Sequence, residues 1–485
     1  MSQDEDDADA IGGEALPLRP VPPVSEQRRE AAVTEADRLA EGHLDQVYRQ
    51  ILARAPEHDF EPTLDRVRAA CELLGQPQLT YQVIHVAGTN GKTSTARIAE
   101  SLLRAHGLRT GLFTSPHLTS MRERIALDGQ PISPAAFLDA WALVSQVVDL
   151  VDQQSLAAGG PRMSFFEVLT VLGFVAFSDA PVDVAVIEVG MGGTWDATNV
   201  VESQVQVITP ISRDHEQWLG STLPEIAGEK AGIVRSQVVI GRQEPEVAEV
   251  LEHAVLAAGA GAFWEDTDFE VLSRQPAVGG QVVSLRSLAG EYREVLVPLF
   301  GAHQASNAAC AVAAVELLLN GAESALGGEV LAEGVEAARS PGRLEVVASA
   351  PTVLVDAAHN VAGAQALVEA VREVFPLGLV GLVGVLADKD AEGILGVLEP
   401  VLDAVVISRS TSPRAMDPHR LGEVAREVFG EDRVEVVERL DAALARAMEL
   451  AAIATGEDPG ALGTGVLATG SVTLAAEVRI LLGVG

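Results

Sequence analysis

The chain has 485 residues, of which 48% are hydrophobic, and its formal net charge at pH 7 is −35. This length predicts two or three domains with sizeable cores. The strong negative charge argues against nucleic acid or an anionic membrane as a partner, because both need a basic footprint. We expect no membrane span, since the longest apolar run, at 168–177, is interrupted by Thr170 and Gly173 and is predicted to be a buried helix.

The N-terminal stretch, residues 1–36, begins with acidic side chains and continues with a proline-rich segment. It lacks the basic start and apolar core of a signal or transit peptide, so we expect a disordered acidic tail on a cytoplasmic protein. Cys71 and Cys310 lie in apolar segments predicted to be helical, and they provide neither a disulfide framework nor a zinc pattern. This cysteine usage fits a reducing compartment.

From residue 81 onward, short β-branched runs alternate with longer amphipathic segments, which is typical of a mostly parallel sheet covered by helices. The predicted strands are 83–87, 111–114, 184–189, 205–209 and 238–240, and the predicted helices are 92–106, 134–151, 166–177 and 222–234. Short alternating runs at 269–299 predict an antiparallel meander appended to this sheet, followed by a helix at 304–319.

A Ser-Pro-Gly turn at 340–342 interrupts the pattern, and a fresh α/β series begins beyond it. We therefore predict a first domain at 37–339, built like a phosphate-loop ATPase, and a smaller Rossmann-like domain at 340–485. The strands of the second domain are predicted at 352–356, 380–386, 404–408, 433–437 and 465–468.

Lysine occurs three times, against 31 arginines, as Lys92, Lys230 and Lys389. Where arginine replaces nearly every lysine, the remaining ones are expected at sites where a guanidinium cannot substitute for an amine. The alternative is that a compositional bias of the genome left three by chance. Lys389 indicates no role beyond an interdomain ion pair or a phosphate contact.

The run Gly-Thr-Asn-Gly-Lys-Thr at 88–93 lies between a predicted strand and a predicted amphipathic helix. In that context it predicts a phosphate loop, whose backbone N–H groups and helix N-terminus hold phosphate oxygens. Lys92 would reach the β- and γ-phosphates, and Thr93 could face a magnesium ion. A glycine-rich turn without a ligand is the alternative.

Polar side chains also follow two neighbouring strands at the edge where open α/β sheets bind ligands. Glu188 ends one strand and is a candidate metal ligand, the alternative being a structural carboxylate. Asp214 and His215 follow the next strand, although a satisfied loop histidine is the commoner case.

Lys230 lies in a predicted helix that we expect to pack against the same sheet. Near a metal, a buried amine is costly as a cation and could be deprotonated and modified. An ordinary ion pair with Glu225 or Glu229 is the alternative.

In the second domain, Asp356, His359 and Asn360 follow a strand. They could hold a ribose and position phosphates, or merely cap the next helix.

Together these segments resemble the Mur ligase superfamily, and most closely its folylpolyglutamate synthase and dihydrofolate synthase branch, from about residue 40 to the C-terminus. The phosphate loop and Gly-Glu-Lys-Ala-Gly-Ile at 228–233 mark the superfamily. Thr-Ser-Pro-His-Leu at 114–118, Ser-Phe-Phe-Glu at 164–167 and Trp-Asp-Ala-Thr-Asn at 195–199 indicate the folate branch.

The resemblance implies roles for particular residues. ATP would be bound by Gly88, Thr89, Asn90, Gly91, Lys92, Thr93, Ser94, Asn307, Arg343 and Asp356. Two Mg²⁺ ions would be held by Thr93, Ser115, Glu188, His215 and Lys230, the last as a carbamate. The pterin would be bound by Ser164, Phe165, Phe166, Glu167, Trp195, Asp196 and Ala197, and the incoming glutamate by Ser412 and Arg414. His359 joins Lys92, Glu188, His215 and Lys230 as a catalytic candidate. A requirement for K⁺ stays open.

The implied reaction is ATP-dependent ligation of L-glutamate, through an acyl phosphate, to dihydropteroate and to tetrahydrofolates. The alternatives are polyglutamylation alone, another Mur-type amino-acid ligase, a phosphate-loop nucleotide switch, or a catalytically silent binding protein. We expect small-molecule substrates only and a monomer. Thr194 stands where arginine is common and Val361 where proline is frequent, which leaves the reaction class intact and the fine specificity open.

Overall fold

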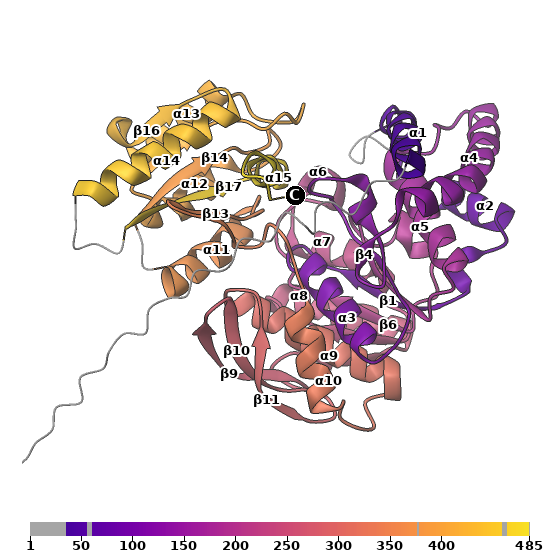
Figure 1. The fold of residues 1–485 in the computed structure, drawn as a ribbon. Coiled ribbons are helices and arrows are strands. Elements are labelled where there is room, and N and C mark those ends of the chain that lie inside the picture. The colour runs from indigo at the N-terminus through magenta and orange to yellow at the C-terminus, as the bar shows by residue number, and fades with distance from the viewer. Residues whose placement is uncertain (1–34, 56–60, 376–377, 458–462, 485) are drawn as a thin grey trace, which may run out of the picture.

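The computed structural model describes residues 35–55, 61–375, 378–457 and 463–484. It contains two α/β units and a small antiparallel sheet (Figure 1). Apart from residues 35–36, the predicted acidic tail lies outside the described residues.

The larger sheet has the strand order β4-β3-β2-β5-β1-β6-β7-β8. It is parallel from β2 to β8, and β3 and β4 extend it as antiparallel strands at one edge. All the strands predicted for this sheet are present, whereas β3, β4 and β8 were not predicted. The bounds are β1 (Gln82–Ala87), β2 (Thr110–Phe113), β3 (Ile125–Leu127), β4 (Gln130–Pro131), β5 (Val184–Glu188), β6 (Val205–Ile208), β7 (Gln237–Ile240) and β8 (Gly261–Trp264).

Helices cover both faces of this sheet, which is why its central strands read as continuous apolar runs. On one face, Ile84 and Val86 of β1 pack in a core with α3 (Lys92–Ala105), α9 (Ala302–Asn320) and α10 (Gly328–Ala337). On the other face lie α4 (Pro134–Ala157), α5 (Phe165–Asp179), α7 (Leu223–Lys230) and α8 (Pro245–Ala258). Further helices are α1 (Glu35–Leu52) and α2 (Asp65–Leu73), which pack beside α4, and the short α6 (Glu216–Leu219).

The predicted antiparallel meander is present as β9 (Glu270–Ala277), β10 (Gly280–Arg286) and β11 (Glu291–Val297). It forms a three-stranded sheet of its own. Its apolar face, which includes Val283 and Leu285, packs in the core with α9 and so attaches the meander to the larger unit.

The second unit has the strand order β12-β13-β17-β14-β15-β16, parallel except for β12. Helices α11 to α13 cover one face, and α14 and α15 cover the other. The bounds are β12 (Glu345–Ser349), β13 (Thr352–Val355), α11 (Val361–Val374), β14 (Gly378–Val383), α12 (Ala391–Leu398), β15 (Ala404–Ile407), α13 (Pro418–Phe429), β16 (Val434–Val436), α14 (Leu440–Glu457), β17 (Thr464–Thr469) and α15 (Val472–Leu481). The predicted fold class matches this architecture, and the domain boundary at 339/340 stays a prediction.

Helix α4 corrects one expectation. Its 24 residues are long and apolar enough, by length and composition alone, to cross a membrane. In this fold it packs on α5 through a stripe at helical spacing, formed by Phe137, Ala140, Val144, Val148 and Val151. The expectation that no segment reaches spanning length is therefore wrong, although one such helix is a weak indication of a membrane protein.

Candidate active site

A cavity of about 1820 Å³ lies where the two units meet. Its wall includes the carboxyl-terminal ends of β1, β5 and β6 and, from the second unit, the segment after β13. The carboxyl edges of both sheets thus face one space, which is the usual ligand position in open α/β folds.

Two glycines shape the loop between β1 and α3. Gly88 and Gly91 have φ angles of +142° and +90°. A Cβ on Gly88 would lie 1.9 Å from Thr209 Oγ1, and one on Gly91 would lie 2.4 Å from Asn307 Oδ1. Only glycine fits both positions, and the first turn of α3, with its unpaired N–H groups, lines the cavity. This geometry is that of an anion-binding helix N-terminus.

The amines of Lys92 and Lys230 converge on the carbonyl oxygen of Gly88, to which they donate at 3.1 and 2.8 Å. Lys92 Nζ also donates to the Thr89 carbonyl at 3.0 Å. Lys230 is 4% exposed, and burial, reinforced by the charge of Lys92, lowers its pKa to about 7. Such an amine is partly neutral at physiological pH, which is the state that modification requires.

The ion-pair alternative for Lys230 does not form. Glu225 instead closes a capping box with Thr222 at the start of α7, and the Lys230 amine donates to the Gly88 carbonyl rather than to a carboxylate.

Glu188, at the end of β5, lies directly against the phosphate loop. Its carboxylate accepts from Thr93 Oγ1 at 2.9 and 3.0 Å and from the Ser115 backbone N–H at 3.2 Å. Burial raises the pKa of Glu188, and the Lys92 charge opposes that rise. Its oxygens and those of the two hydroxyl side chains are hard donors of the kind that Mg²⁺ prefers.

The described part of the chain holds no group of three or more histidine, cysteine or acidic side chains arranged around a metal position. Mg²⁺ in nucleotide sites commonly uses one or two carboxylates together with phosphate oxygens and water. Glu188 with Thr93 and Ser115 therefore fits Mg²⁺ held jointly with a nucleotide. Burial lowers the pKa of His215 to about 3, so its ring is neutral near pH 7.

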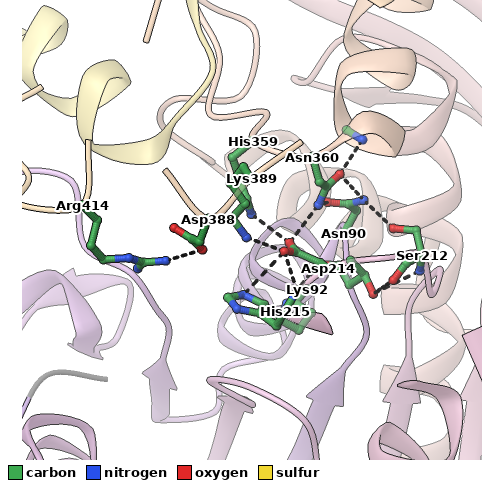
Figure 2. Close-up of polar contacts among 12 residues, drawn as sticks. Asn90, Lys92, Ser212, Asp214, His215, His359, Asn360, Asp388, Lys389 and Arg414 are labelled. Carbon is green, nitrogen blue, oxygen red and sulfur yellow. Dashed lines mark hydrogen bonds and ion pairs between the residues drawn. The ribbon is translucent and has the colours of Figure 1, made fainter. Parts of the chain in front are cut away.

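Asp214 connects the two units, as Figure 2 shows. It forms an ion pair with Lys389, and Asn360 Nδ2 donates to its Oδ2 at 3.0 Å. His359 Nε2 lies 3.4 Å from the same oxygen. Burial alone would raise the pKa of Asp214, yet His359, His215 and Lys389 hold it well below its ordinary value. Of the two roles considered for Lys389, the interdomain ion pair is therefore present.

A second interdomain contact involves two amides. Asn90 Nδ2 donates to Asn360 Oδ1 at 3.2 Å, and Asn360 Nδ2 donates back to Asn90 Oδ1 at 3.1 Å (Figure 2). Asn360 Oδ1 also accepts from the Gly363 backbone, so this residue both caps α11 and faces the phosphate loop. For Asn360, capping the helix and lying in the site are therefore compatible.

Breaking the Asp214–Lys389 pair tests its structural contribution. Both side chains are 6% exposed, so Lys389→Met leaves a buried carboxylate without its lysine partner and is expected to cost about 3–5 kcal/mol in urea unfolding. Arg274→Met is the matched control, because Arg274 and Glu373 also join the two units but are 29% and 28% exposed. Its expected cost is below about 1 kcal/mol. Equal effects of the two variants would contradict this assignment.

Most of the predicted pterin residues line the cavity: Ser164, Phe166, Glu167, Trp195, Asp196 and Ala197. Ser164 and Glu167 form a capping box at the start of α5, and Glu167 accepts from the buried Arg66 at 3.0 Å. Arg66 was missed by the sequence analysis. Phe165 does not line the cavity, since its ring packs against the Arg124 guanidinium, 5.1 Å away.

Most of the site residues predicted in the second unit also line the cavity. Arg343, Asp356, His359 and Arg414 line the cavity, and Ser412 does not. Asp356 accepts from the backbone N–H groups of Leu344 and Ala358 at 2.8 and 2.7 Å. Arg414 is paired with Asp388 at 2.7 Å (Figure 2). From the first unit, Asn307, Ser94 and Ser115 also line the cavity, and Ser94 contacts Ser340 at 3.2 Å.

A phosphate loop on one α/β unit, facing a second α/β unit across a shared cavity, defines a two-domain nucleotide-dependent ligase of the Mur type. Residues 142–315 match the Mur ligase middle domain, and residues 342–471 match the Mur ligase glutamate ligase domain. The chain belongs to the dihydrofolate synthase/folylpolyglutamate synthase family.

The relatives are similar over most of their length. The dihydrofolate synthase/folylpolyglutamate synthase of Mycobacterium tuberculosis is 50% identical over 448 residues, 89% of this chain and 92% of that protein. The Bacillus subtilis protein of the same name is 34% identical over 79% of this chain and 89% of its own. A structure of Mycobacterium tuberculosis folylpolyglutamate synthase complexed with ADP superposes with a TM-score of 0.88 at 49% identity, covering 92% and 99% of the two chains.

The predicted family, fold class and enzyme class, an ATP-dependent carboxylate–amine ligase, are thereby confirmed.

Proposed function

We propose that this protein joins L-glutamate to dihydropteroate and to tetrahydrofolates at the expense of ATP. The observation that carries the proposal is that the phosphate loop, the Asp196 segment and the carboxyl edge of the second unit all line one shared cavity. The names of the Mycobacterium tuberculosis and Bacillus subtilis relatives include both activities. An Escherichia coli relative, 27% identical, has been solved with ADP and a compound abbreviated DHPP.

The proposed chemistry has two steps. A carboxylate oxygen of the pterin substrate attacks the γ-phosphorus of ATP, giving an acyl phosphate and ADP. The glutamate amine then attacks the acyl carbon, an amide bond forms and phosphate leaves. Activation is needed because a carboxylate is a poor electrophile, and a cavity enclosed by two units limits hydrolysis of the acyl phosphate.

The residues would divide this work. Lys92 and the N–H groups at the start of α3 would bind the β- and γ-phosphates and offset charge during transfer. Asn307, Arg343 and Asp356 would hold the rest of the nucleotide. Thr93, Ser115, Glu188, His215 and Lys230 as a carbamate would hold two Mg²⁺ ions, which neutralise phosphate charge when bound.

The carbamate on Lys230 is supported by the position of its amine. A protonated Lys230 would lie against Lys92 at the same carbonyl oxygen, and the two cations repel each other. Addition of CO₂ to the neutral amine releases a proton and leaves an anion there, so the repulsion becomes attraction.

Glutamate would bind near Arg414 and His359, which line the cavity from the second unit. Ser412 lies farther back, where its hydroxyl accepts from the Arg414 backbone N–H, so it would act on glutamate only through Arg414. We also propose that the protein is a cytoplasmic monomer that binds no nucleic acid. A requirement for K⁺ stays open.

The proposal is tested by glutamate-dependent phosphate release from ATP, measured separately with dihydropteroate and with tetrahydrofolate. We expect activity with both. Activity with tetrahydrofolate alone would leave a polyglutamylase, and ATP hydrolysis indifferent to both folates and to glutamate would replace the ligase with a nucleotide switch.

A further inference from the structure

His85 is a buried polar residue that the proposed chemistry does not use. It lies in β1, between Ile187 of β5 and Gln206 of β6, and it is 0% exposed. Burial lowers its pKa to about 3, so the ring is neutral under physiological conditions. A neutral imidazole in the central strand of a sheet is costly unless its nitrogens are hydrogen-bonded.

Only one of those nitrogens has a partner. His85 Nε2 lies 2.8 Å from Thr198 Oγ1, whereas His85 Nδ1 is buried without a hydrogen-bond partner in the structure. Leaving a buried Nδ1 unpaired is unfavourable. Among the described residues, the contact at Nε2 is therefore the ring's one hydrogen bond.

The contact continues from Thr198 to Asp196. The Thr198 hydroxyl donates to Asp196 Oδ1, which also accepts from the Thr198 backbone N–H at 3.0 Å. Asp196 Oδ2 accepts from the Met191 backbone N–H at 2.9 Å. Asp196 is 3% exposed and lines the cavity.

The direction of each hydrogen bond follows from the chemistry of the groups. An ionised carboxylate only accepts, so the single hydroxyl hydrogen of Thr198 points to Asp196. The Thr198 oxygen must then accept from His85, which places the ring hydrogen on Nε2 and leaves Nδ1 bare. The hydrogen bonds therefore run in one direction: His85 donates to Thr198, and Thr198 donates to the Asp196 carboxylate at the cavity wall.

We propose that His85 is a positioning residue, which through Thr198 fixes the Asp196 carboxylate so that Oδ2, which has one acceptor position left, accepts an N–H donor of a pterin ring. The chemistry of the ligand supports this, because the 2-amino group and the neighbouring ring N–H of a pterin place such donors along one edge of the ring. The inference rests on the proposed function and deepens it, because it concerns the pterin subsite of the same cavity.

The strand also carries the phosphate loop, and this provides a discriminating measurement. If His85 merely supports β1, its replacement should weaken ATP and pterin binding together. If it positions Asp196, the KM for dihydropteroate should rise about 10- to 100-fold in His85→Leu, as for loss of hydrogen bonds to a charged group, while the KM for ATP stays unchanged.

Paired variants test the donor position. Gln places its amide nitrogen three bonds from Cβ, as Nε2 is in histidine, whereas Asn reaches only the position of Nδ1. His85→Gln should restore the pterin KM and His85→Asn should not. Thr198→Val should reproduce His85→Leu, Thr198→Ser should retain function, and the Leu/Val double variant should add little beyond either single one.

Val83→Ala is the matched control, because Val83 is equally buried two residues earlier on the same face of β1. It should reduce stability and leave the pterin KM unchanged. The variants are compared below their unfolding temperatures, and calorimetric titration of dihydropteroate into each protein accompanies the kinetics.

The outcomes separate the two proposals. Ligation by the wild-type protein with an unchanged pterin KM in His85→Leu, or with parallel losses for ATP, would overturn the positioning role alone. Absence of pterin binding by the wild-type protein would overturn both.

Discussion

Lys92→Ala is expected to lower glutamate-dependent phosphate release by at least about 10³-fold, with the loss in kcat rather than in the KM for the pterin. The Lys92 amine lies at the start of α3 and donates to the carbonyls of Gly88 and Thr89, so it belongs to the loop that would receive the phosphates. Removing a preorganised charge from a site sheltered from water costs more than removing it from a surface.

The substitution also has a defined structural cost, so the fold must be monitored. Thermal unfolding and ADP binding by calorimetry report whether the loop survives. Lys92→Arg keeps the charge as a planar fork, and we expect it to recover only part of kcat. Retention of more than a tenth of the wild-type kcat by a folded Lys92→Ala protein would remove Lys92 from the reaction.

Much of the fold was predicted from local patterns, and so were the phosphate loop and the candidate residues Glu188 and His215, whereas the pterin and glutamate candidates were implied by the resemblance to a family. The β-branched runs predicted the central strands, and Glu188 and His215 were placed at one edge because parallel strands share the direction of their carboxyl ends. Gly88 and Gly91 indicated a tight loop, which the close approach of Thr209 and Asn307 explains.

The contacts that sequence patterns did not predict join segments remote in the chain. Arg66 of α2 pairs with Glu167 of α5, a contact that was not predicted. An interdomain ion pair was one of the roles considered for Lys389, but its partner, Asp214, was not predicted. In both cases the partner depends on how the elements pack. The position of Asp214 beside His215 indicated that it lies at the same edge of the sheet. Only the histidine was given a candidate role there, as a metal ligand, so the ion pair of the carboxylate was missed.

Phe165 and Ser412 show what a motif does not specify. Both stand inside motif segments, yet neither lines the cavity. In a helix, neighbouring residues point to different faces, so Phe166 reaches the cavity while Phe165 turns to Arg124. A motif specifies a segment, and the local backbone decides which of its side chains face the ligand.

Lys230→Ala is expected to abolish ligation and to recover it with added acetate, whereas Lys92→Ala should recover with ethylamine and not with acetate. The two lysines contact the same Gly88 oxygen, so an acetate effect unrelated to the missing side chain would appear in both variants. Opposite rescue chemistries would show that one position needs a cation and the other an anion. Absence of acetate rescue, together with an unmodified Lys230 in a ligand-bound crystal, would contradict the carbamate.

The pH dependence provides a second test of the carbamate. The pKa of Lys230 is lowered from 10.5 to about 7, so its unmodified amine is mostly protonated below pH 7 and mostly neutral above it. Only the neutral amine adds CO₂, and activity should therefore fall as pH drops through about 7. Added bicarbonate should restore part of the activity on the acid side, because it opposes loss of the carbamate by mass action.

The same shift has a consequence for stability in the absence of CO₂. An unfolded lysine, with its pKa near 10.4, still binds a proton that the buried amine releases above pH 7, so the free energy of unfolding should rise more steeply between about pH 7 and pH 10 than it would without this group. In that window the unfolded chain binds more protons than the folded chain. The contribution of this amine to the free energy of unfolding therefore increases as the pH rises. Lys230→Met should remove it, which separates the titration of this amine from every other group in the cavity.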